Sequence, residues 1–220
     1  MNLDVIYSDE DVWVINKPSG VSLLRDRAGE SNLWDQIKRD LGKPYMVHRL
    51  DKGTSGVLII ARHQSAQSRL TRSFGNHQVE KFYLAWVVGL FPTGHTLTID
   101  MPLCKGRKSR YRVAGERKRI VQRGKRFEVT QDREGVDAVT KVRCLRHNNQ
   151  HSLMLLNPIH GRTHQLRVHM SWLGHAIVGD HLYGAQSDPA QQHPRLQLHC
   201  HKIVILQQTY KSHFDLSSGP

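Results

Sequence analysis

A polar, turn-forming segment that runs directly into an apolar strand is the feature that most constrains this chain. Residues 48–56 read His-Arg-Leu-Asp-Lys-Gly-Thr-Ser-Gly, and residues 57–61 read Val-Leu-Ile-Ile-Ala. A short apolar run bounded by turn residues is typical of a buried strand. Because loops at strand ends often hold site residues, Asp51 is the residue to explain. The residues alone leave two interpretations open, an aspartate that caps the turn together with Thr54 and Ser55, or a catalytic aspartate.

Length and cysteine content are those of a compact protein without covalent cross-links. The 220 residues are most simply one domain, or two tightly joined lobes, and a chain of this length buries about 70% of its unfolded surface. Cys104, Cys144 and Cys200 are odd in number, far apart and without a C-x-x-C pair. This pattern disfavours a disulfide framework and a cysteine zinc site, and it indicates a reducing compartment.

The sequence indicates neither export nor membrane insertion. Residues 1–12 contain acids in place of a basic leader. No run approaches the roughly 18 apolar residues that a membrane span needs. We therefore expect a mature cytoplasmic protein with no membrane contact.

Basic residues outnumber acidic ones and gather in one stretch. Lys and Arg number 32 and Asp and Glu 19, so the formal net charge is +13, and such a field attracts polyanions. The excess is densest in residues 105–126, here called the basic segment, where the only acid is Glu116. A basic run is either a solvated face or mobile loop, or a nucleic-acid footprint, and the charge of the whole chain favours the footprint. The candidate RNA-binding residues in it are Arg107, Lys108, Arg110 and Arg112.

The apolar pattern predicts strands that alternate with isolated helices. This order favours an α+β domain over regular βαβ winding. In residues 79–88, Tyr83 falls on the less apolar side of the alternation, so we expect it to face a cleft. The expected strands are a hairpin at residues 3–7 and 12–15, and strands at residues 57–61, 79–88, 138–145, 153–156 and 196–206.

Three helices are expected from spacing and end signals. The first places apolar residues at every fourth position from residue 33 to residue 41, with Ser31 as its cap and Gly42 and Pro44 at its end. The second is expected at about residues 65–74, ended by Gly75. The third follows Thr163 as its cap and ends at residue 174.

Four stretches resemble, in kind and in order, the motifs of the RluA-type family of RNA pseudouridine synthases. Residues 48–56 resemble the family's H-R-L-D-x-x-T-S-G, residues 81–89 its K-x-Y-x-A…G strand, residues 161–169 its G-R-T-H-Q-[IL]-R-x-H, and residues 179–184 its G-D-x-x-Y-G. The resemblance implies a mixed, largely antiparallel central sheet with flanking helices and one RNA-binding cleft. It also implies a single catalytic domain over residues 1–220, with no accessory RNA-binding domain ahead of it.

The reaction implied by the resemblance is the isomerisation of uridine to pseudouridine in RNA. The bond from ribose to the base nitrogen breaks, the uracil turns, and it rejoins the sugar through carbon 5. No metal and no cofactor is expected. A carboxylate can act as nucleophile on the sugar or the base, or as an acid/base on the sugar, and each role requires it to be ionised and held in place. By resemblance this carboxylate is Asp51.

The resemblance also implies roles for residues around that aspartate. Arg162 would keep it ionised, although it could instead be a surface cation at a helix start, where the macrodipole disfavours it. Tyr83 would stack against the target base, and the alternative is half-buried packing. Arg49 would help hold the RNA open beside the extruded base, a task that suits a guanidinium plane. His48 and His164 are expected to orient the backbone rather than to exchange protons.

Three other classes of function compete with this interpretation. A zinc hydrolase would need a ligand motif such as H-E-x-x-H, and a glycosidase would need a second carboxylate near Asp51; neither is present in the sequence. An RNA-binding protein with an inactive site is expected to have lost Asp51, Tyr83 or Arg162, and all three are present. Asp180 and Tyr183 are expected to be structural.

The RNA target is less sharply indicated. The partner is expected to be ribosomal or transfer RNA, bound by a monomer. Residues 115–118 and 135–140 faintly resemble members that act on large-subunit ribosomal RNA, which is the favoured target.

Overall fold

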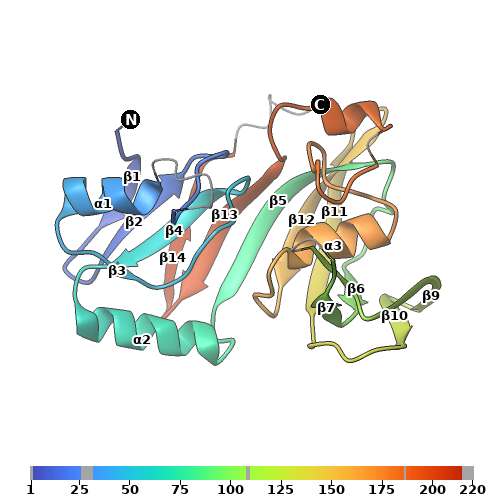
Figure 1. Cartoon of the computed structure of the whole chain (residues 1–220), viewed down its shortest axis with the longest axis horizontal. Helices are drawn as coiled ribbons and strands as arrows, with labels where there is room; N and C mark the ends of the chain where they lie inside the picture. Colours follow the sequence, from blue (N-terminus) through green and yellow to red (C-terminus); the bar gives the residue numbers. More distant parts are fainter. Residues whose placement is uncertain (1, 26–31, 108–109, 186, 215–220) are drawn as a thin grey trace. The chain divides into compact units, whose positions relative to one another are not determined.

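The computed structural model describes residues 2–25, 32–107, 110–185 and 187–214. These residues form two compact units (Figure 1). Unit 1 consists of the described residues of 1–81 and 199–215, and unit 2 of residues 82–198. The chain passes from unit 1 to unit 2 within one strand, β5, and returns within another, β13. No helix among the described residues is long and apolar enough to cross a membrane.

Unit 1 is built on a mixed sheet in which β1, β2, β4 and β13 follow one another, with β14 beside β13 and β3 beside β4. The parallel pair in it is β4 with β13, and the other pairings are antiparallel. Strand β4 is buried along its whole length, as the apolar run predicted. Its elements are β1 (Val5–Ser8), β2 (Val12–Lys17), α1 (Leu33–Leu41), β3 (Tyr45–Met46), β4 (Ser55–Ala61), α2 (Gln64–Gly75), β13 (Leu198–Ile205) and β14 (Gln208–Lys211).

The helices of unit 1 begin and end close to the predicted positions. Helix α1 packs Leu33 and Ile37 into a core with Ile15, Leu58 and Ile60. Its cap is Asn32, whose side chain accepts the Asp35 backbone N–H. The cap that we expected, Ser31, lies outside the described residues.

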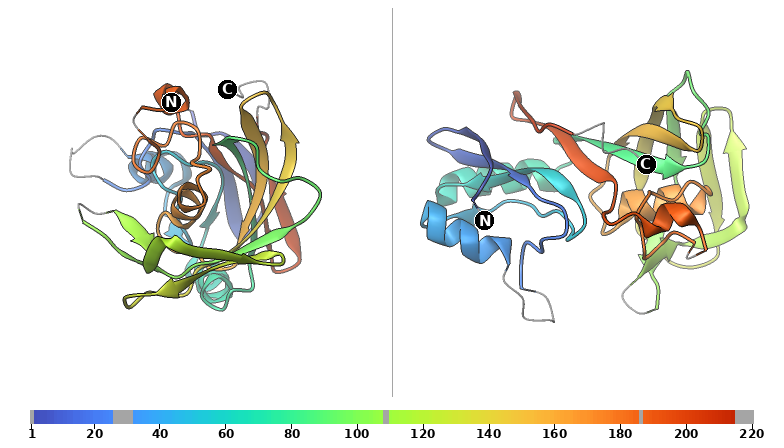
Figure 2. Two further views of the ribbon diagram at one scale, coloured as in Figure 1. Left: turned by 90° about the vertical axis from the view of Figure 1, so that its right-hand side faces the viewer. Right: turned by 90° about the horizontal axis from the view of Figure 1, so that it is seen from above.

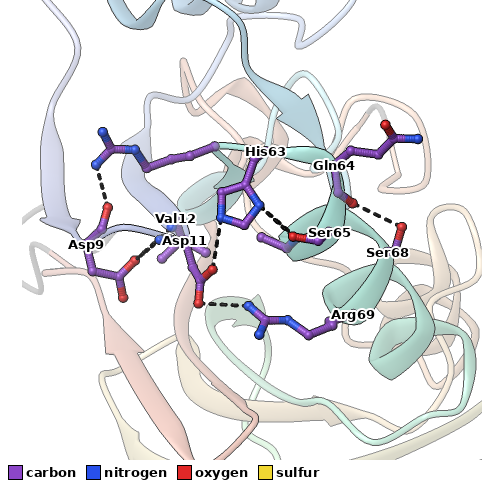
Figure 3. A network of polar contacts seen from close by, with 10 residues as sticks. Asp9, Asp11, Val12, His63, Gln64, Ser65, Ser68 and Arg69 are labelled. Carbon is purple, nitrogen blue, oxygen red and sulfur yellow. Dashed lines mark hydrogen bonds and ion pairs between the residues drawn. The ribbon is translucent and has the colours of Figure 1, made fainter.

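The start of α2 is tied to the turn between β1 and β2 (Figure 3). His63 is the N-cap, and its Nδ1 accepts hydrogen bonds from the Ala66 N–H at 3.3 Å and from the Ser65 hydroxyl at 2.8 Å. Its Nε2 lies 3.1 Å from a carboxylate oxygen of Asp11, whose other oxygen is 2.8 Å from Arg69. These groups are about half exposed, so each contact contributes less than about 1 kcal/mol. The helix includes residue 75, which we expected to lie just beyond its end.

The strands of unit 2 follow one another in the order β5, β12, β11, β6, β10, β9, and β7 and β8 form a separate hairpin. Strands β6 and β10 pair in parallel, and their neighbours are antiparallel. Its elements are β5 (Glu80–Val88), β6 (Leu97–Asp100), β7 (Leu103–Lys105), β8 (Tyr111–Val113), β9 (Gly115–Arg123), β10 (Arg126–Gln131), β11 (Val139–His147), β12 (His151–Pro158), α3 (Gln165–Trp172) and a 3-10 turn at Pro189–Gln192.

Helix α3 lies against the sheet of unit 2 (Figure 2). Its buried residues Leu166, Val168 and Met170 share a core with residues of β11 and β12. The cap that we expected at Thr163 is wrong, because the helix begins after His164, which has φ 57° and makes no side-chain cap bond. The expected fold class is confirmed, since each unit combines a mixed, mostly antiparallel sheet with helices. The expected cleft stays a prediction.

Candidate active site

Asp51 begins a tight backbone turn that leads into β4. The Thr54 N–H donates to the Asp51 carbonyl at 3.0 Å, which closes the turn over Lys52 and Gly53. Asp51 is half-buried, Lys52 is exposed, and Thr54 is already buried. The position predicted from the sequence is therefore confirmed: the aspartate lies where a turn meets a buried strand.

A second segment, residues 17–20, holds this turn from its other side. The Lys17 Nζ donates to the carbonyl groups of Pro18 at 2.9 Å, Lys52 at 3.2 Å and Thr54 at 2.9 Å. The Ser19 hydroxyl donates to the Gly53 carbonyl at 2.7 Å. Residue 20 adds a backbone bond to the Lys52 carbonyl at 2.9 Å. Donors from residues 17, 19 and 20 thus bind the carbonyl groups of the turn that carries the aspartate and fix it in place.

Lys17 is the residue that sequence reasoning missed. Residues 16–20 look like an ordinary Asn-Lys-Pro-Ser-Gly turn, in which a lysine is expected to be solvated. In the structure Lys17 has no exposed surface. Burial lowers its pKa to about 8, while the negative charge of Asp51 acts in the opposite direction. The available signal was its place two residues after Ile15 in strand β2, on a buried side of the strand.

His48 is held as a neutral, orienting residue. Its Nε2 accepts the Ile59 N–H at 3.0 Å, and its ring stacks on Phe74 with centroids 4.6 Å apart. Burial, with a smaller effect from the charge of Lys81, lowers the His48 pKa to about 3. A ring that is neutral at every physiological pH and accepts a backbone hydrogen bond agrees with the expected orienting role.

A close approach of two strands fixes the start of β4. Gly56 has φ +109°, and a Cβ added there would lie 2.2 Å from the carbonyl oxygen of Cys200 in β13. Only glycine fits such a position. Beside it, the Ser55 hydroxyl is hydrogen-bonded to His199 Nδ1 at 2.9 Å. The Thr-Ser-Gly part of the motif therefore serves packing, and Arg49 remains exposed on the loop before the turn.

Tyr83 and Arg162 belong to unit 2. Tyr83 lies in β5 opposite Leu156 of β12 and is half-buried against the core of its unit. Arg162 is exposed, and its Nε donates to the Asp137 carbonyl at 3.0 Å. Asp51 belongs to unit 1, and its pairing with Arg162 stays a prediction.

Gln165 anchors the loop that carries Arg162. Its Oε1 accepts the Arg162 N–H at 3.1 Å, and its Nε2 donates to the Val139 carbonyl and to the Thr140 hydroxyl, both at 3.0 Å. The backbone N–H of Gln165 in turn donates to the Arg162 carbonyl at 3.0 Å. The guanidinium thus projects from a loop that is tied to the first residues of β11.

The contacts of Asp180 and Tyr183 agree with the structural role that we expected. Asp180 is buried and accepts two hydrogen bonds from Arg167, at 2.7 and 2.8 Å. The Tyr183 hydroxyl accepts the Tyr111 N–H at 2.9 Å and is 2.7 Å from His164 Nδ1. These bonds connect hairpin β7–β8 with the start of α3.

Three histidines, His160, His169 and His201, form hydrogen bonds that connect separate segments. His160 Nδ1 accepts the Val139 N–H at 3.0 Å, and His169 joins Thr140 and Met101 at 2.9 Å each. His201 Nδ1 lies 2.8 Å from the Ser212 carbonyl oxygen. Within the described residues, no group of three or more His, Cys, Asp or Glu side chains could hold a metal ion.

Most of the described part of the basic segment forms strands. It runs from the end of β7 through β8 and β9 to the start of β10. Its cations are exposed except Arg112, which is half-buried with its guanidinium 5.6 Å from the Trp172 ring; Lys108 lies outside the described residues. Arg117 lies 5.5 Å from the same ring and donates to the Ser171 carbonyl at 3.1 Å. Most of the described part of the segment is therefore a charged β surface of unit 2, and Arg107 and Arg110 lie in the connection between β7 and β8.

Comparison with known proteins agrees with the sequence motifs. The chain matches the RNA pseudouridylate synthase family over residues 11–172. It is 34% identical over 212 residues to the dual-specificity RNA pseudouridine synthase RluA of Escherichia coli K12, covering 94% of this chain and 89% of that protein. It is 36% identical over 211 residues to an uncharacterised RNA pseudouridine synthase of Zymomonas mobilis, covering 91% and 86%.

Solved structures give the same result. The human RNA pseudouridylate synthase domain containing 1 superposes with a TM-score of 0.79 at 27% identity, covering 97% of this chain and 83% of that chain. The human RNA pseudouridylate synthase domain containing 4 superposes with a TM-score of 0.78 at 22% identity, covering 97% of this chain and 89% of that chain. At this identity the likeness shows the fold alone. The matched motifs, the shared fold and the length of the matches lead to one conclusion: the chain belongs to the RluA-type RNA pseudouridine synthases, isomerases that convert uridine to pseudouridine in RNA.

Proposed function

We propose that Asp51 is the catalytic carboxylate of this isomerase. The observation that carries the proposal is the turn itself, in which the carbonyl groups of residues 51–54 all accept hydrogen bonds from protein donors. A nucleophile or an acid/base must be held in one place while the uracil detaches, turns and reattaches. The half-buried carboxylate of Asp51 extends from a rigid support and lies beside a buried positive charge.

Two residues of unit 2 are proposed to complete the site. Arg162, projecting from its anchored loop, would pair with the carboxylate and keep it ionised. Tyr83, half-buried in β5, would present its ring to the target base and help remove the proton from carbon 5. The Gln165 contacts support this role for Arg162, because an anchored loop costs less entropy to bring into a working geometry.

We propose that the RNA is held by exposed cations on both units. Arg49 is exposed next to the Asp51 turn, where its planar guanidinium can stack in the space left by the extruded base. The basic segment would supply phosphate contacts that position the RNA without reading its sequence. The exposure of Arg107, Arg110 and Arg117 supports this assignment.

Large-subunit ribosomal RNA is the proposed substrate, with transfer RNA as a second candidate. The second candidate is favoured by the name of the relatives at 34% identity, which describes them as dual-specificity enzymes. We propose that a cytoplasmic monomer acts on the RNA without a metal or cofactor.

Mapping of pseudouridines tests the substrate. Ribosomal and transfer RNA are isolated from cells with and without the gene, and their pseudouridines are mapped. RNA from the deletion strain is then incubated with purified protein and EDTA, and the lost positions are mapped again. We expect a ribosomal position to disappear and to be restored in vitro. Restoration of transfer RNA positions alone would replace the first candidate with the second, and no lost position in either RNA would contradict both.

A further inference from the structure

A chain of buried hydrogen bonds leads from helix α3 to the backbone of Arg162. Its members His169, Thr140 and Gln165 each have 3% or less of their surface exposed. We propose that His169 is a positioning residue for Arg162: through Thr140 and Gln165 it fixes the direction of the hydrogen bond that holds the Arg162 backbone. The inference rests on the proposed pairing of Arg162 with Asp51. His169 has no exposed surface, so its effect on turnover passes through Arg162.

The two ring nitrogens of His169 have opposite roles. Nε2 lies 2.9 Å from the Met101 carbonyl oxygen, which can only accept a hydrogen bond, so Nε2 carries a hydrogen. Burial lowers the His169 pKa to about 4, and the ring is therefore neutral near pH 7. In a neutral ring the second nitrogen has no hydrogen, so Nδ1 accepts the Thr140 hydroxyl hydrogen at 2.9 Å.

The direction of this bond decides how the Gln165 amide is oriented. Because Thr140 directs its only hydroxyl hydrogen to His169, its oxygen accepts one Gln165 Nε2 hydrogen at 3.0 Å. The other Nε2 hydrogen goes to the Val139 carbonyl at 3.0 Å. With both amide hydrogens in use, the Gln165 Oε1 faces the Arg162 N–H and accepts it at 3.1 Å.

The reversed orientation of the Gln165 amide is unfavourable at every contact. It places Oε1 against the Val139 carbonyl oxygen and the Thr140 oxygen, and it places the NH₂ group against the Arg162 N–H. Each of these buried contacts joins two acceptors or two donors and leaves polar groups unsatisfied. The His169 tautomer, set by the Met101 carbonyl, therefore selects a single arrangement of the loop that carries Arg162.

Packing alone does not require these polar groups. Replacing both partners of a buried hydrogen bond with apolar groups of the same shape is often nearly neutral for stability. A fully satisfied polar network instead specifies one arrangement of its surroundings. This network ends at the backbone of an arginine whose Nε is also held, by the Asp137 carbonyl at 3.0 Å. Such precision matters for a residue proposed to pair with the reacting carboxylate, because a misplacement of about 1 Å can lower a rate about 100-fold.

Thr140→Val tests the inference, because valine resembles threonine in shape and removes the hydroxyl in the middle of the chain. The substrate is ribosomal and transfer RNA from cells that lack the gene. We expect the single-turnover rate constant at saturating RNA to fall about tenfold and the RNA dissociation constant to change by less than about threefold. Thr140→Ser keeps the hydroxyl and is the matched control, expected to stay within about threefold of the wild-type rate.

A second variant applies if circular dichroism shows that Thr140→Val does not fold. His169→Gln keeps an N–H donor for the Met101 carbonyl and removes the Nδ1 acceptor of Thr140, so the same loss of rate is expected. A folded Thr140→Val with the wild-type rate would overturn the inference. An equal loss in Thr140→Ser, or a loss in RNA affinity in place of rate, would overturn it as well.

A double-mutant cycle tests whether the effect passes through Arg162. Arg162→Met is measured alone and together with Thr140→Val, and we expect the second substitution to add less than about twofold to the loss from the first. Additive losses would overturn the positioning role. A wild-type rate for Arg162→Met alone would reject the proposed pairing with Asp51, whereas a slow Arg162→Met beside a wild-type Thr140→Val rejects the role of His169 alone.

Discussion

The two units use positive charge in opposite ways. In unit 1 the fully buried Lys17 donates to three carbonyl groups at 2.9 to 3.2 Å and fixes one turn. In unit 2 the basic segment displays its cations on exposed strands, where Arg117, Lys118 and Arg119 are open to solvent. A buried charge acts on one neighbour at short range with little screening, whereas exposed charges act on a polyanion together, and each is weak. Removal of one group should therefore matter greatly in unit 1 and little in the basic segment.

The largest expected effect concerns Asp51, in the turn to which Lys17 donates hydrogen bonds. Asp51→Asn keeps the shape of the side chain and removes its charge, so we expect turnover to fall by more than about 1000-fold while RNA affinity stays within about threefold. Tritium release from labelled uridine in RNA measures the rate, and filter binding measures affinity. Residual turnover above about a tenth of wild type would exclude Asp51 as the catalyst.

The comparison extends to stability through two ion pairs of unit 2. Arg167 pairs with Asp180, whose side chain has no exposed surface, whereas Arg126 pairs with Asp100 at a site where the arginine is 51% exposed. Arg167→Leu leaves a buried carboxylate without its partner, and we expect it to lower the free energy of unfolding by about 3–5 kcal/mol. Arg126→Leu is the matched control and should cost less than about 1 kcal/mol. Equal losses in urea denaturation would show that burial does not separate the two pairs.

Arg162 tests whether an exposed cation can act like a buried one. If it stabilises the Asp51 carboxylate in the working enzyme, Arg162→Met makes protonation of that carboxylate easier and moves the acid limb of activity to higher pH. We expect a loss of about 10-fold to 100-fold near neutral pH. The pH dependence of the single-turnover rate measures it, with Arg39→Met on α1 as an exposed control. An unchanged acid limb with normal activity would remove Arg162 from the site.

Local pattern predicted much of the fold, and long-range contacts account for what it missed. Strand β4 and helix α1 follow from apolar spacing and end signals, and both were found close to the expected bounds. The prediction that Thr163 caps α3 was wrong, because the backbone there is set by Gln165, whose side chain bonds to β11, distant in the sequence. Propensity at the helix start contains no information about that bond.

The candidate site divides in the same way. Asp51 was identified because turn chemistry and strand burial are local, and the family motif added its role. Lys17 was missed because the acceptors that justify a buried lysine come mainly from residues 35 and 37 positions further along the chain. A lysine followed by Pro and Gly predicts a solvated turn unless those acceptors are known. The basic segment was ambiguous because charge alone does not separate a mobile loop from a strand.

The smallest effects per residue are expected in the basic segment. Replacing Arg107, Lys108, Arg110 and Arg112 with Gln should weaken binding of all RNAs roughly alike, because phosphate contacts position without reading sequence. Each lost contact removes about 0.7 to 0.9 from the slope of log affinity against log salt, so two true contacts among the four are measurable. Turnover at saturating RNA should stay near wild type, since these side chains are not proposed to touch the uridine.

A control of equal charge decides what that result means. Lys38, Arg39, Lys43 and Lys211 are exposed cations of unit 1, and their replacement by Gln lowers the net charge by the same amount. If only the overall field attracts RNA, both quadruple variants lose the same salt slope. We expect the larger loss from the basic segment, because direct phosphate contacts release counterions and a distant charge does not. An unchanged slope in the basic-segment variant would show that the basic segment is a solvated face. The contrast between a buried cation that acts alone and exposed cations that act together on RNA would then fail for unit 2.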